Sequence, residues 1–315
     1  MRETREGASG EAPEEGNAPE EGLVPAEKGI VGSKRGSGSS RSLSGGSTVG
    51  ELEKYLFGMF PEEHCEDWDK SGLLVGDASA QVEGVAIALD PQVKTIDKAA
   101  EMGCNVLLTH HPAYIEAPER IVNLGHGGTD AGRRVAHAVR DGVALIAMHT
   151  NLDRSPLAMA LLLNKLGLSY VEGLIDDGSG KPPFGCIGVP DAGENLTLST
   201  FAYRCEATYG IYPRVWGDPG QVLHSVGVAN GSSSSFASDI VALDIDCLVT
   251  GEMSYHHASE VVASGISLIE LGHDVSEFPL LDVLGRVVEG SDTFGRNVCM
   301  LEPDISWWQP GMVRK

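Results

Sequence analysis

Short apolar runs alternate with helix-like segments along most of this chain of 315 residues. Strand-like runs at 85–90, 105–110 and 142–149 are separated by segments with helical periodicity, and the alternation continues in the second half of the chain. Such alternation is typical of a largely parallel sheet, because parallel strands need crossover connections that are usually helices. The sequence therefore predicts an α/β fold with two α/β lobes, residues 49–170 and 171–315, built on mostly parallel sheets.

Three of the apolar runs end abruptly in residue types that bind metals. VLLTHHP ends in His110 and His111, LIAMHTNLD ends in Asp153, and LIELGHDVSE contains His273 and Glu277. The carboxyl ends of strands in an α/β sheet open into a crevice where ligands bind. Neutral imidazoles and carboxylates are ligands that many transition metals share. We therefore expect these five residues to form a metal site in a cleft between the lobes.

The spacing of these residues suggests a pair of ions. Adjacent side chains on extended backbone point to opposite sides, so His110 and His111 suit two neighbouring ions better than two bonds to one ion. His273 and Glu277 are four positions apart and would share one face of a helix, and the two oxygens of Glu277 can bridge two cations. The alternatives are surface or capping histidines, a helix cap at Asp153, and a first-turn acid at Glu277 favoured by the helix dipole.

Three further residues are candidates for moving protons. His149 in AMHTNLD can be a ligand, a proton carrier or a partner that orients a ligand. Glu252 and His256 belong to the polar GEMSYHH segment after a strand-like run, and they can instead orient ligands or cap a helix over 255–264. Two cations about 3.5–4 Å apart polarise a carbonyl or phosphoryl oxygen, so hydrolysis is the chemistry that we expect.

Two other segments have more than one interpretation. Trp68 in EDWDKSGLLVG is interpreted as a packing anchor in preference to a stacking platform for a base. The segment GVANGSSSS (227–235) precedes a predicted helix, so its backbone amides can bind a phosphate or carboxylate. The same segment is equally suited to a tight turn between a strand and a helix.

Residues 1–48 are expected to form a disordered acidic and Ser/Gly-rich tail. They contain EAPEEGNAPEEG and GSKRGSGSSRSLSGGS, in which Gly, Ser, Pro and Glu dominate and little can be buried. Ser47 or Thr48 then provides an N-cap for a helix in VGELEKYLFGMF.

Charge and cysteine usage exclude several classes of protein. The formal net charge is -22 and no Lys/Arg cluster offsets it, so binding to a nucleic acid polymer is not expected. The six cysteines are scattered without a C-x-x-C pair, which indicates reduced thiols and a cytoplasmic location. No run approaches the ~18 apolar residues of a membrane span, and the N-terminus lacks the apolar stretch of a signal peptide. We expect a cytoplasmic protein with no membrane partner.

Five short blocks resemble the signature sequences of one family. In chain order they are DWDKSGLLVGD (67–77), LLTHHPAYI (107–115), AMHTNLD (147–153), VTGEMSYHH (249–257) and GHDVSE (272–277). Together they resemble the NIF-three-like proteins (DUF34), also described as GTP cyclohydrolase I type 2-like dinuclear metal-binding proteins. One block departs from the family pattern, because a GHYATE-like sequence reads GHDVSE here and puts Asp274 beside His273.

This resemblance implies a NIF-three-like fold with two divalent metal ions in the cleft between the lobes. It implies that Glu277 bridges the ions and that the ligands are His110, His111, Asp153, His273 and Glu277. It also implies a ring-like homo-oligomer, commonly a hexamer, that hydrolyses a nucleotide or similar small substrate. The alternative is a non-catalytic protein for metal binding, metal trafficking or protein interaction. Imidazole-rich sites without thiolates suit Zn, Fe, Mn, Co or Ni.

Overall fold

The computed structural model describes residues 47–121, 130–302 and 307, and these residues belong to one compact unit. The predicted disordered tail lies outside the described residues except for its last two positions. Within the described part of the chain, no helix combines the length and the apolarity that crossing a membrane requires.

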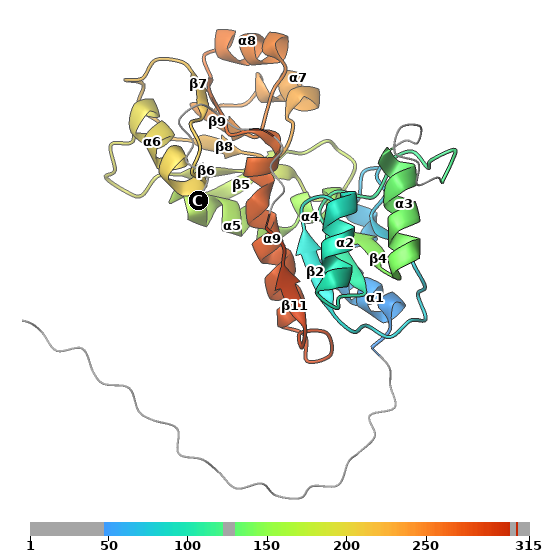
Figure 1. Cartoon of the computed structure of the whole chain (residues 1–315). Coiled ribbons are helices and arrows are strands. Elements are labelled where there is room, and N and C mark those ends of the chain that lie inside the picture. Colours follow the sequence, from blue (N-terminus) through green and yellow to red (C-terminus); the bar gives the residue numbers. More distant parts are fainter. Residues whose placement is uncertain (1–46, 122–129, 303–306, 308–315) are drawn as a thin grey trace, which may run out of the picture. The chain divides into compact units, whose positions relative to one another are not determined.

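The first sheet has five strands in the order β1-β4-β3-β2-β11 (Figure 1). Their bounds are β1 Gly72–Val75, β2 Val85–Ala88, β3 Val106–Thr109, β4 Ala144–Ala147 and β11 Val298–Met300. β1 runs antiparallel to β4, whereas the other neighbouring strands are parallel. β2, β3 and β4 are buried along their whole length, as central strands are when helices cover both faces of a sheet.

Helices cover both faces of this sheet. Alternate strand residues point to opposite faces, so each face presents its own apolar side chains to a helix layer. α1 (Val49–Met59) packs on the face to which Leu108 of β3 points. α2 (Val93–Glu101) and α3 (Asp130–Asp141) pack on the opposite face, where Leu107 of β3 lies.

The second sheet has six strands in the order β5-β6-β8-β9-β10-β7 (Figure 1). Their bounds are β5 Ser169–Ile175, β6 Phe184–Val189, β7 Arg214–Trp216, β8 Val226–Val228, β9 Cys247–Thr250 and β10 Ser267–Glu270. β8, β9 and β10 are parallel to one another, and β5, β6 and β7 form antiparallel flanks. α5 (Pro156–Leu166) and α6 (Leu198–Tyr209) cover one face of this sheet, and α7 (Ala237–Ile240) and α8 (Tyr255–Ala263) cover the other.

α9 (His273–Glu289) packs against the cores of both sheets. Val275 in its first turn belongs to the core cluster of the second sheet, whereas Leu280 and Leu284 belong to that of the first sheet. Phe278 packs against both clusters. The N-terminal turn of α9 therefore lies where the two cores meet. The remaining short elements are α4 (Thr150–Asp153), η1 (Glu62–His64) and η2 (Ser234–Phe236).

The predicted two-sheet α/β fold is confirmed, and the differences lie at its edges. Thr48 caps α1 in a capping box with Glu51, as the sequence indicated. α9 begins at His273, so His273 and Glu277 lie on one helix, as their spacing indicated. β1, β5 and β7 were not predicted. All three are antiparallel to their neighbours. β5 also exposes Ser169 to Glu172, so it lacks the buried apolar run by which the other strands were recognised.

The boundary between lobes at residue 170 stays a prediction as a domain boundary, because segments from both sides of it contribute strands to the first sheet. β11 lies in the range assigned to the second lobe, yet Val298 pairs with Val85 of β2 in the first sheet. The second half of α9 also packs on the first sheet. This return of the chain depends on contacts between distant segments, which a local pattern does not reveal.

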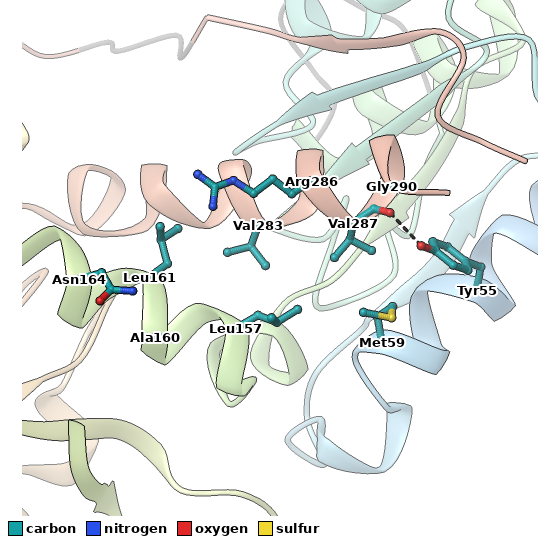
Figure 2. Close-up of a pocket in the computed structure, with 10 residues that line it drawn as sticks. All are labelled: Tyr55, Met59, Leu157, Ala160, Leu161, Asn164, Val283, Arg286, Val287 and Gly290. Atoms are coloured by element: carbon teal, nitrogen blue, oxygen red, sulfur yellow. Dashed lines mark hydrogen bonds between the residues drawn. The ribbon is translucent and has the colours of Figure 1, made fainter. Parts of the chain in front are cut away.

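A largely apolar groove of about 440 Å³ lies between α1, α5 and α9 (Figure 2). Met59, Leu157 and Val283 contribute apolar side chains, and Tyr55 of α1 donates a hydrogen bond to the carbonyl of Val287 in α9 at 2.9 Å. None of the residues that line this groove is a predicted ligand or a predicted proton carrier. The groove is therefore separate from the predicted metal site.

Candidate metal centre

His110 and His111 follow directly after β3 and continue its pairing with the neighbouring strand. The backbone N–H of His110 donates to the carbonyl of Ala88, and that of His111 donates to the carbonyl of Leu89. Thr109 Oγ1 donates to the carbonyl of His111 at 2.7 Å, which holds the backbone just past the strand. Both imidazoles are therefore carried by the edge of a buried sheet and not by a free loop.

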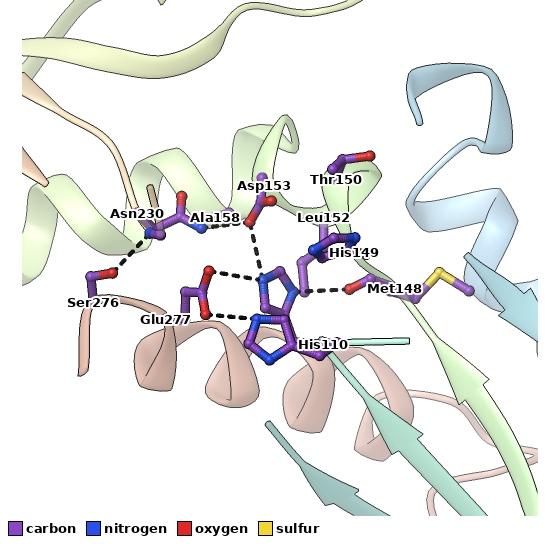
Figure 3. Close-up of polar contacts among 12 residues, drawn as sticks. His110, Met148, His149, Thr150, Leu152, Asp153, Ala158, Asn230, Ser276 and Glu277 are labelled. Carbon is purple, nitrogen blue, oxygen red and sulfur yellow. Dashed lines mark hydrogen bonds and ion pairs between the residues drawn. The ribbon is translucent and has the colours of Figure 1, made fainter. Parts of the chain in front are cut away.

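Asp153 and Glu277 reach the same place from two helices, at the end of α4 and one turn into α9. Nε2 of His110 lies 3.4 Å from Oδ1 of Asp153 and 3.5 Å from Oε1 of Glu277 (Figure 3). Nε2 of His111 lies 3.0 Å from Oε2 of Glu277, and Nε2 of His273 lies 3.3 Å from Oε1 of Glu277. The structure thus brings the five residues of the predicted ligand set together around Glu277.

Two buried atoms of this cluster lack a hydrogen-bond partner among the described residues. They are Nε2 of His110 and Oε2 of Glu277. The approach of His111 to that oxygen is short but lacks hydrogen-bond geometry. A buried polar atom without a partner costs about 1–3 kcal/mol. An imidazole nitrogen and a carboxylate oxygen are donors that divalent transition metals accept, so these residues fit a bound cation.

A glycine turn shapes the wall beside Glu277. Gly231 has φ +59, and a Cβ atom there would lie 2.6 Å from Oε1 of Glu277. Only glycine tolerates both the backbone angle and this close approach. The turn therefore leaves free space next to the carboxylate.

Each of the four histidines in the cluster pairs its Nδ1 atom with an acceptor. The pairs are His110 with the carbonyl of Met148 (3.1 Å), His111 with Asp90 (2.9 Å), His149 with Asp69 (2.7 Å) and His273 with Glu252 (3.0 Å). An acceptor at Nδ1 favours the tautomer that carries its proton there, which leaves the lone pair of Nε2 for a metal. His149 has the same arrangement as the three histidines of the predicted ligand set.

Two overlapping groups of residues have ligand atoms close enough to share a cation. The ligand atoms of His111, His273 and Glu277 lie within 4.8 Å of one another, and so do those of His110, His111 and His149. The imidazole centroids of His110 and His111 are 5.0 Å apart. The geometry therefore offers more than one position for an ion, and the number of ions stays a prediction.

The charges of the cluster shift the pKa values of its members. Burial lowers the pKa of His111, but Asp90 and Glu277 outweigh it and raise that pKa to about 10. Burial also lowers the pKa of His110, and Asp153 and Glu277 bring it above its ordinary value. Burial raises the pKa of Glu277, but the two adjacent histidines hold it well below its usual range. Glu277 is therefore an anion at neutral pH.

Asp69 is a buried acceptor that orients His149. It accepts hydrogen bonds from Nδ1 of His149 at 2.7 Å and from the backbone N–H and hydroxyl of Thr150 at 3.1 and 2.6 Å. Burial raises the pKa of Asp69, but the hydrogen bond and charge of His149 lower it well below its usual range. The imidazole of His149 therefore has a fixed orientation beside the cluster.

Trp68 lies at the edge of the site with 54% of its surface exposed. Its ring meets that of His149 edge-on, with 5.8 Å between the centroids. The residues around it are anchored, since Glu66 pairs with the buried Arg154 and Asp69 binds His149. Trp68 therefore combines a ring contact with His149 and an exposed surface, and the choice between a packing anchor and a stacking platform stays a prediction.

The segment 227–235 forms a tight turn between β8 and η2, and anion binding by its remaining amides stays a prediction. The backbone N–H of Gly231 donates to Oγ of Ser276 at 2.9 Å, and that of Ser233 donates to the carbonyl of Glu252. Asn230 in the same turn donates to Oδ1 of Asp153 at 2.5 Å (Figure 3). The turn therefore orients a predicted ligand.

The predicted proton carriers differ in their positions. His149 joins the cluster, whereas Glu252 contacts it through Nδ1 of His273. His256 is exposed on α8 and its ring contacts that of Tyr255, with 5.5 Å between the centroids. The structure gives no contact between His256 and the predicted ligand set, and its catalytic role stays a prediction.

Sequence reasoning did not identify Asp90, Asp69 and Asn230 as partners of the candidate ligands. Asp90 directly follows the apolar run VAIAL, so it lies at the end of a strand-like run, as His110 and His111 do. Asp69 and Asn230 lie in polar turns without such a signal. Their roles come from hydrogen bonds to residues 80 and 77 positions away.

Comparisons with known proteins agree with this architecture. Residues 47–304 match the family Duf34/NIF3 (NGG1p interacting factor 3). A protein of Clostridium acetobutylicum named GTP cyclohydrolase 1 type 2 homolog is 31% identical over 228 residues, which cover 72% of this chain and 84% of that protein. A protein of the same name from Streptomyces coelicolor is 30% identical over 256 residues, covering 78% of this chain and 88% of that protein.

A crystal structure shows the same fold. The Staphylococcus aureus hypothetical protein SA1388 superposes with a TM-score of 0.72 at 22% identity, covering 84% of this chain and 99% of that one. The family match spans both sheets and every residue of the candidate metal centre. The chain therefore belongs to the Duf34/NIF3 (NGG1p interacting factor 3) family.

Proposed function

We propose that this protein binds two divalent cations and uses them to hydrolyse a small substrate. The observation that carries the proposal is the position of Glu277, a buried carboxylate in contact with His110, His111 and His273. When bound, such a cation pair supplies Lewis acidity toward a carbonyl or phosphoryl oxygen and toward water. The donor set of imidazoles and carboxylates suits Zn, Fe, Mn, Co or Ni.

The ligand set divides into two halves that share one carboxylate. His110 and Asp153 would hold one cation, and His111 and His273 would hold the other. Glu277 would bridge them. The acceptors at each Nδ1 atom keep the imidazoles in orientations that present Nε2, as metal-binding histidines require.

His149 is the residue best suited to move a proton. Its Nδ1 atom is bound to Asp69, and the ligand atom that it offers lies within 4.8 Å of those of His110 and His111. Asp69 holds the imidazole in one orientation, as a carboxylate partner does for a histidine that acts as an acid or base. Glu252 acts in this proposal through His273, whose orientation it fixes.

The substrate that we propose is a nucleotide or a similar small molecule with a planar ring. The relatives named GTP cyclohydrolase 1 type 2 homolog suggest this class. The exposed ring of Trp68 beside His149 supports it, because a base stacks favourably on an aromatic side chain.

Metal analysis and an activity screen test this proposal together. Protein purified without chelator should contain about one to two equivalents of a divalent metal per chain. Metal-loaded protein should hydrolyse a member of a panel of nucleotides, dinucleotides and cyclic amides, and the Glu277→Gln variant should not. Metal binding without turnover of any panel member would favour a metal-binding or metal-trafficking protein. Absence of metal after reconstitution would exclude both functions.

The predicted assembly and location are separate proposals. A homo-oligomer, with a hexamer as the expected size, should be visible as the molar mass in light scattering of the full-length protein. A monomer at micromolar concentration would contradict it. Fractionation of cells that produce the protein should place it in the cytoplasm.

A further inference from the structure

Two cysteine thiols meet on one face of the first sheet. Sγ of Cys104 lies 3.2 Å from Sγ of Cys299, although the two residues are 195 positions apart. Cys104 is buried just before β3, and Cys299 is half-buried in the middle of β11. All six cysteines are among the described residues, and no other pair has a thiol–thiol contact.

The packing of the sheet explains why these thiols meet. Cys299 lies opposite Ala86 in the pairing of β11 with β2, and Ala86 lies opposite Leu107 in the pairing of β2 with β3. These side chains and Cys104 belong to one core cluster under α2 and α3. Gly84, just before β2, leaves room for the thiol of Cys104, since a Cβ atom at that position would lie 3.1 Å from its Sγ atom.

We propose that Cys104 and Cys299 form a redox-sensitive dithiol site, which a low-molecular-weight disulfide such as oxidised glutathione converts into an intramolecular disulfide. The thiol contact already brings the sulfur atoms close to bonding distance, which is about 2.05 Å in a disulfide. The proposal is independent of the proposed hydrolase activity.

The reaction proceeds through two thiol–disulfide exchanges. The thiolate of Cys299 attacks one sulfur of oxidised glutathione, which forms a mixed disulfide and releases the first glutathione thiolate. Cys104 then loses its proton to solvent and attacks the sulfur of Cys299, which closes the Cys104–Cys299 bond and releases the second glutathione. Two protein thiols are oxidised, and one glutathione disulfide is reduced to two thiols.

The exposure of the two residues sets this order. Cys299 is half-buried and can meet a solvent molecule, whereas only 2% of Cys104 is exposed. Burial and the neighbouring thiol raise the pKa of Cys104 to about 12. Formation of the mixed disulfide removes that neighbouring thiol, so the second step becomes easier than a direct attack by Cys104.

The Cys104–Cys299 disulfide would link the edge strand β11 to the start of β3 at the centre of the sheet. β11 has three residues and pairs only with β2. A cross-link to the start of β3 would close a loop of about 195 residues and restrict the unfolded chain. His110 lies at the other end of β3, about 20 Å away at ~3.3 Å per residue. The metal centre should therefore be unaffected.

The test uses reduced full-length protein incubated with oxidised glutathione, followed by denaturation and alkylation of the remaining thiols. Mass spectrometry should show four alkylated cysteines where the reduced protein shows six, and a linked peptide pair that contains Cys104 and Cys299. The oxidised protein should melt on the order of 5–10 °C higher than the reduced protein. Six alkylated cysteines, a persistent glutathione adduct on Cys299, or a linkage between other cysteines would overturn the proposal.

Two variants complete the design. Cys299→Ser should fold, because its side chain is half-buried on an edge strand, and it should lose both the linkage and the shift in melting temperature. Cys65→Ser is the matched control, because Cys65 is also half-buried but contacts no other thiol. It should retain both effects. Metal content should be equal in the oxidised and reduced protein, and a difference would contradict the proposed separation of the dithiol from the metal centre.

Discussion

Oε2 of Glu277 lies 3.0 Å from Nε2 of His111 without forming a hydrogen bond, although both side chains are largely buried. The charge of His111 lies beside this oxygen, but the buried carboxylate loses its water without gaining a hydrogen bond of good geometry. A cation between these two atoms would satisfy both of them. Substitution of Glu277 is therefore the most direct test of the candidate metal centre.

Replacement of Glu277 by Gln should reduce metal binding to a small fraction of an equivalent. The amide keeps the size of the side chain but removes the charge and one of the two oxygens, so it cannot bridge cations. Elemental analysis of the purified variant measures the effect. Glu289→Gln is the control, because this residue is exposed near the other end of α9. Unchanged metal content in Glu277→Gln would refute the bridging role.

Metal binding should release protons and become tighter as pH rises. The pKa of His111 is about 10, because Asp90 and Glu277 outweigh the effect of burial, so its imidazole is protonated at pH 7 when no metal is bound. A metal ligand must be neutral imidazole, and the proton is therefore displaced on binding. Affinity should increase with pH until the pH approaches that pKa. Calorimetry in two buffers of different ionisation enthalpy counts the protons, and equal heats in both would contradict this coupling.

Replacement of Trp68 by Ala should have little effect on stability but a large effect on ligand binding. The side chain is 54% exposed, so the free energy of unfolding should fall by less than the ~3–5 kcal/mol that truncation of a fully buried aromatic costs. Binding of a nucleotide should weaken by about 1–3 kcal/mol through lost stacking. Urea unfolding and titration of metal-loaded protein measure the two effects. Trp68→Phe should restore much of the binding. A loss of stability without a loss of binding would instead indicate that Trp68 is a packing residue.

Replacement of Asp69 by Asn should destabilise the fold by about 1–3 kcal/mol. The carboxylate is buried and accepts hydrogen bonds from His149 and Thr150, which the amide cannot reproduce. Urea unfolding at pH 7 measures the change. Asp67→Asn is the matched control, since Asp67 lies two residues away with an exposed side chain. Equal stability of the two variants would refute a special role for Asp69.

The stability difference between the wild type and Asp69→Asn should shrink in acid. The pKa of Asp69 lies below its ordinary value in the folded protein because the interactions with His149 outweigh burial. A lowered folded-state pKa contributes stability above the unfolded pKa of about 3.9, and this contribution is lost as pH falls through the folded value. Unfolding free energies at pH 7 and at pH 3 should therefore differ more for the wild type than for the variant. A constant difference would show that the pKa of Asp69 is the same in the folded and unfolded states, which would contradict the lowered folded-state pKa.

Much of the candidate centre was predictable from local sequence. VLLTHHP shows that a buried strand ends in two histidines, and LGHDVSE shows a histidine and a glutamate spaced for one helical face. Both patterns depend only on neighbouring residues. The structure accordingly places His110 and His111 directly after β3, and Glu277 on the helix that begins at His273.

The partners of these residues were not predictable in the same way. Asp69 meets His149 across 80 positions, and Asn230 meets Asp153 across 77 positions. Both contacts depend on how two packed segments are placed relative to each other. Exposure is also a tertiary property, which explains why the sequence did not show that 54% of the surface of Trp68 is exposed.

Sequence alone determined the class of fold and the residue types at the strand ends, because burial patterns and side-chain chemistry are properties of adjacent residues. Only the tertiary structure decided that β11 returns to the first sheet, that α9 packs on both cores, and that Glu277 touches the two histidines that follow β3 as well as His273 of its own helix. Those relationships arise from packing between segments far apart in the chain. The local sequence pattern does not show which helix and sheet surfaces pack against each other.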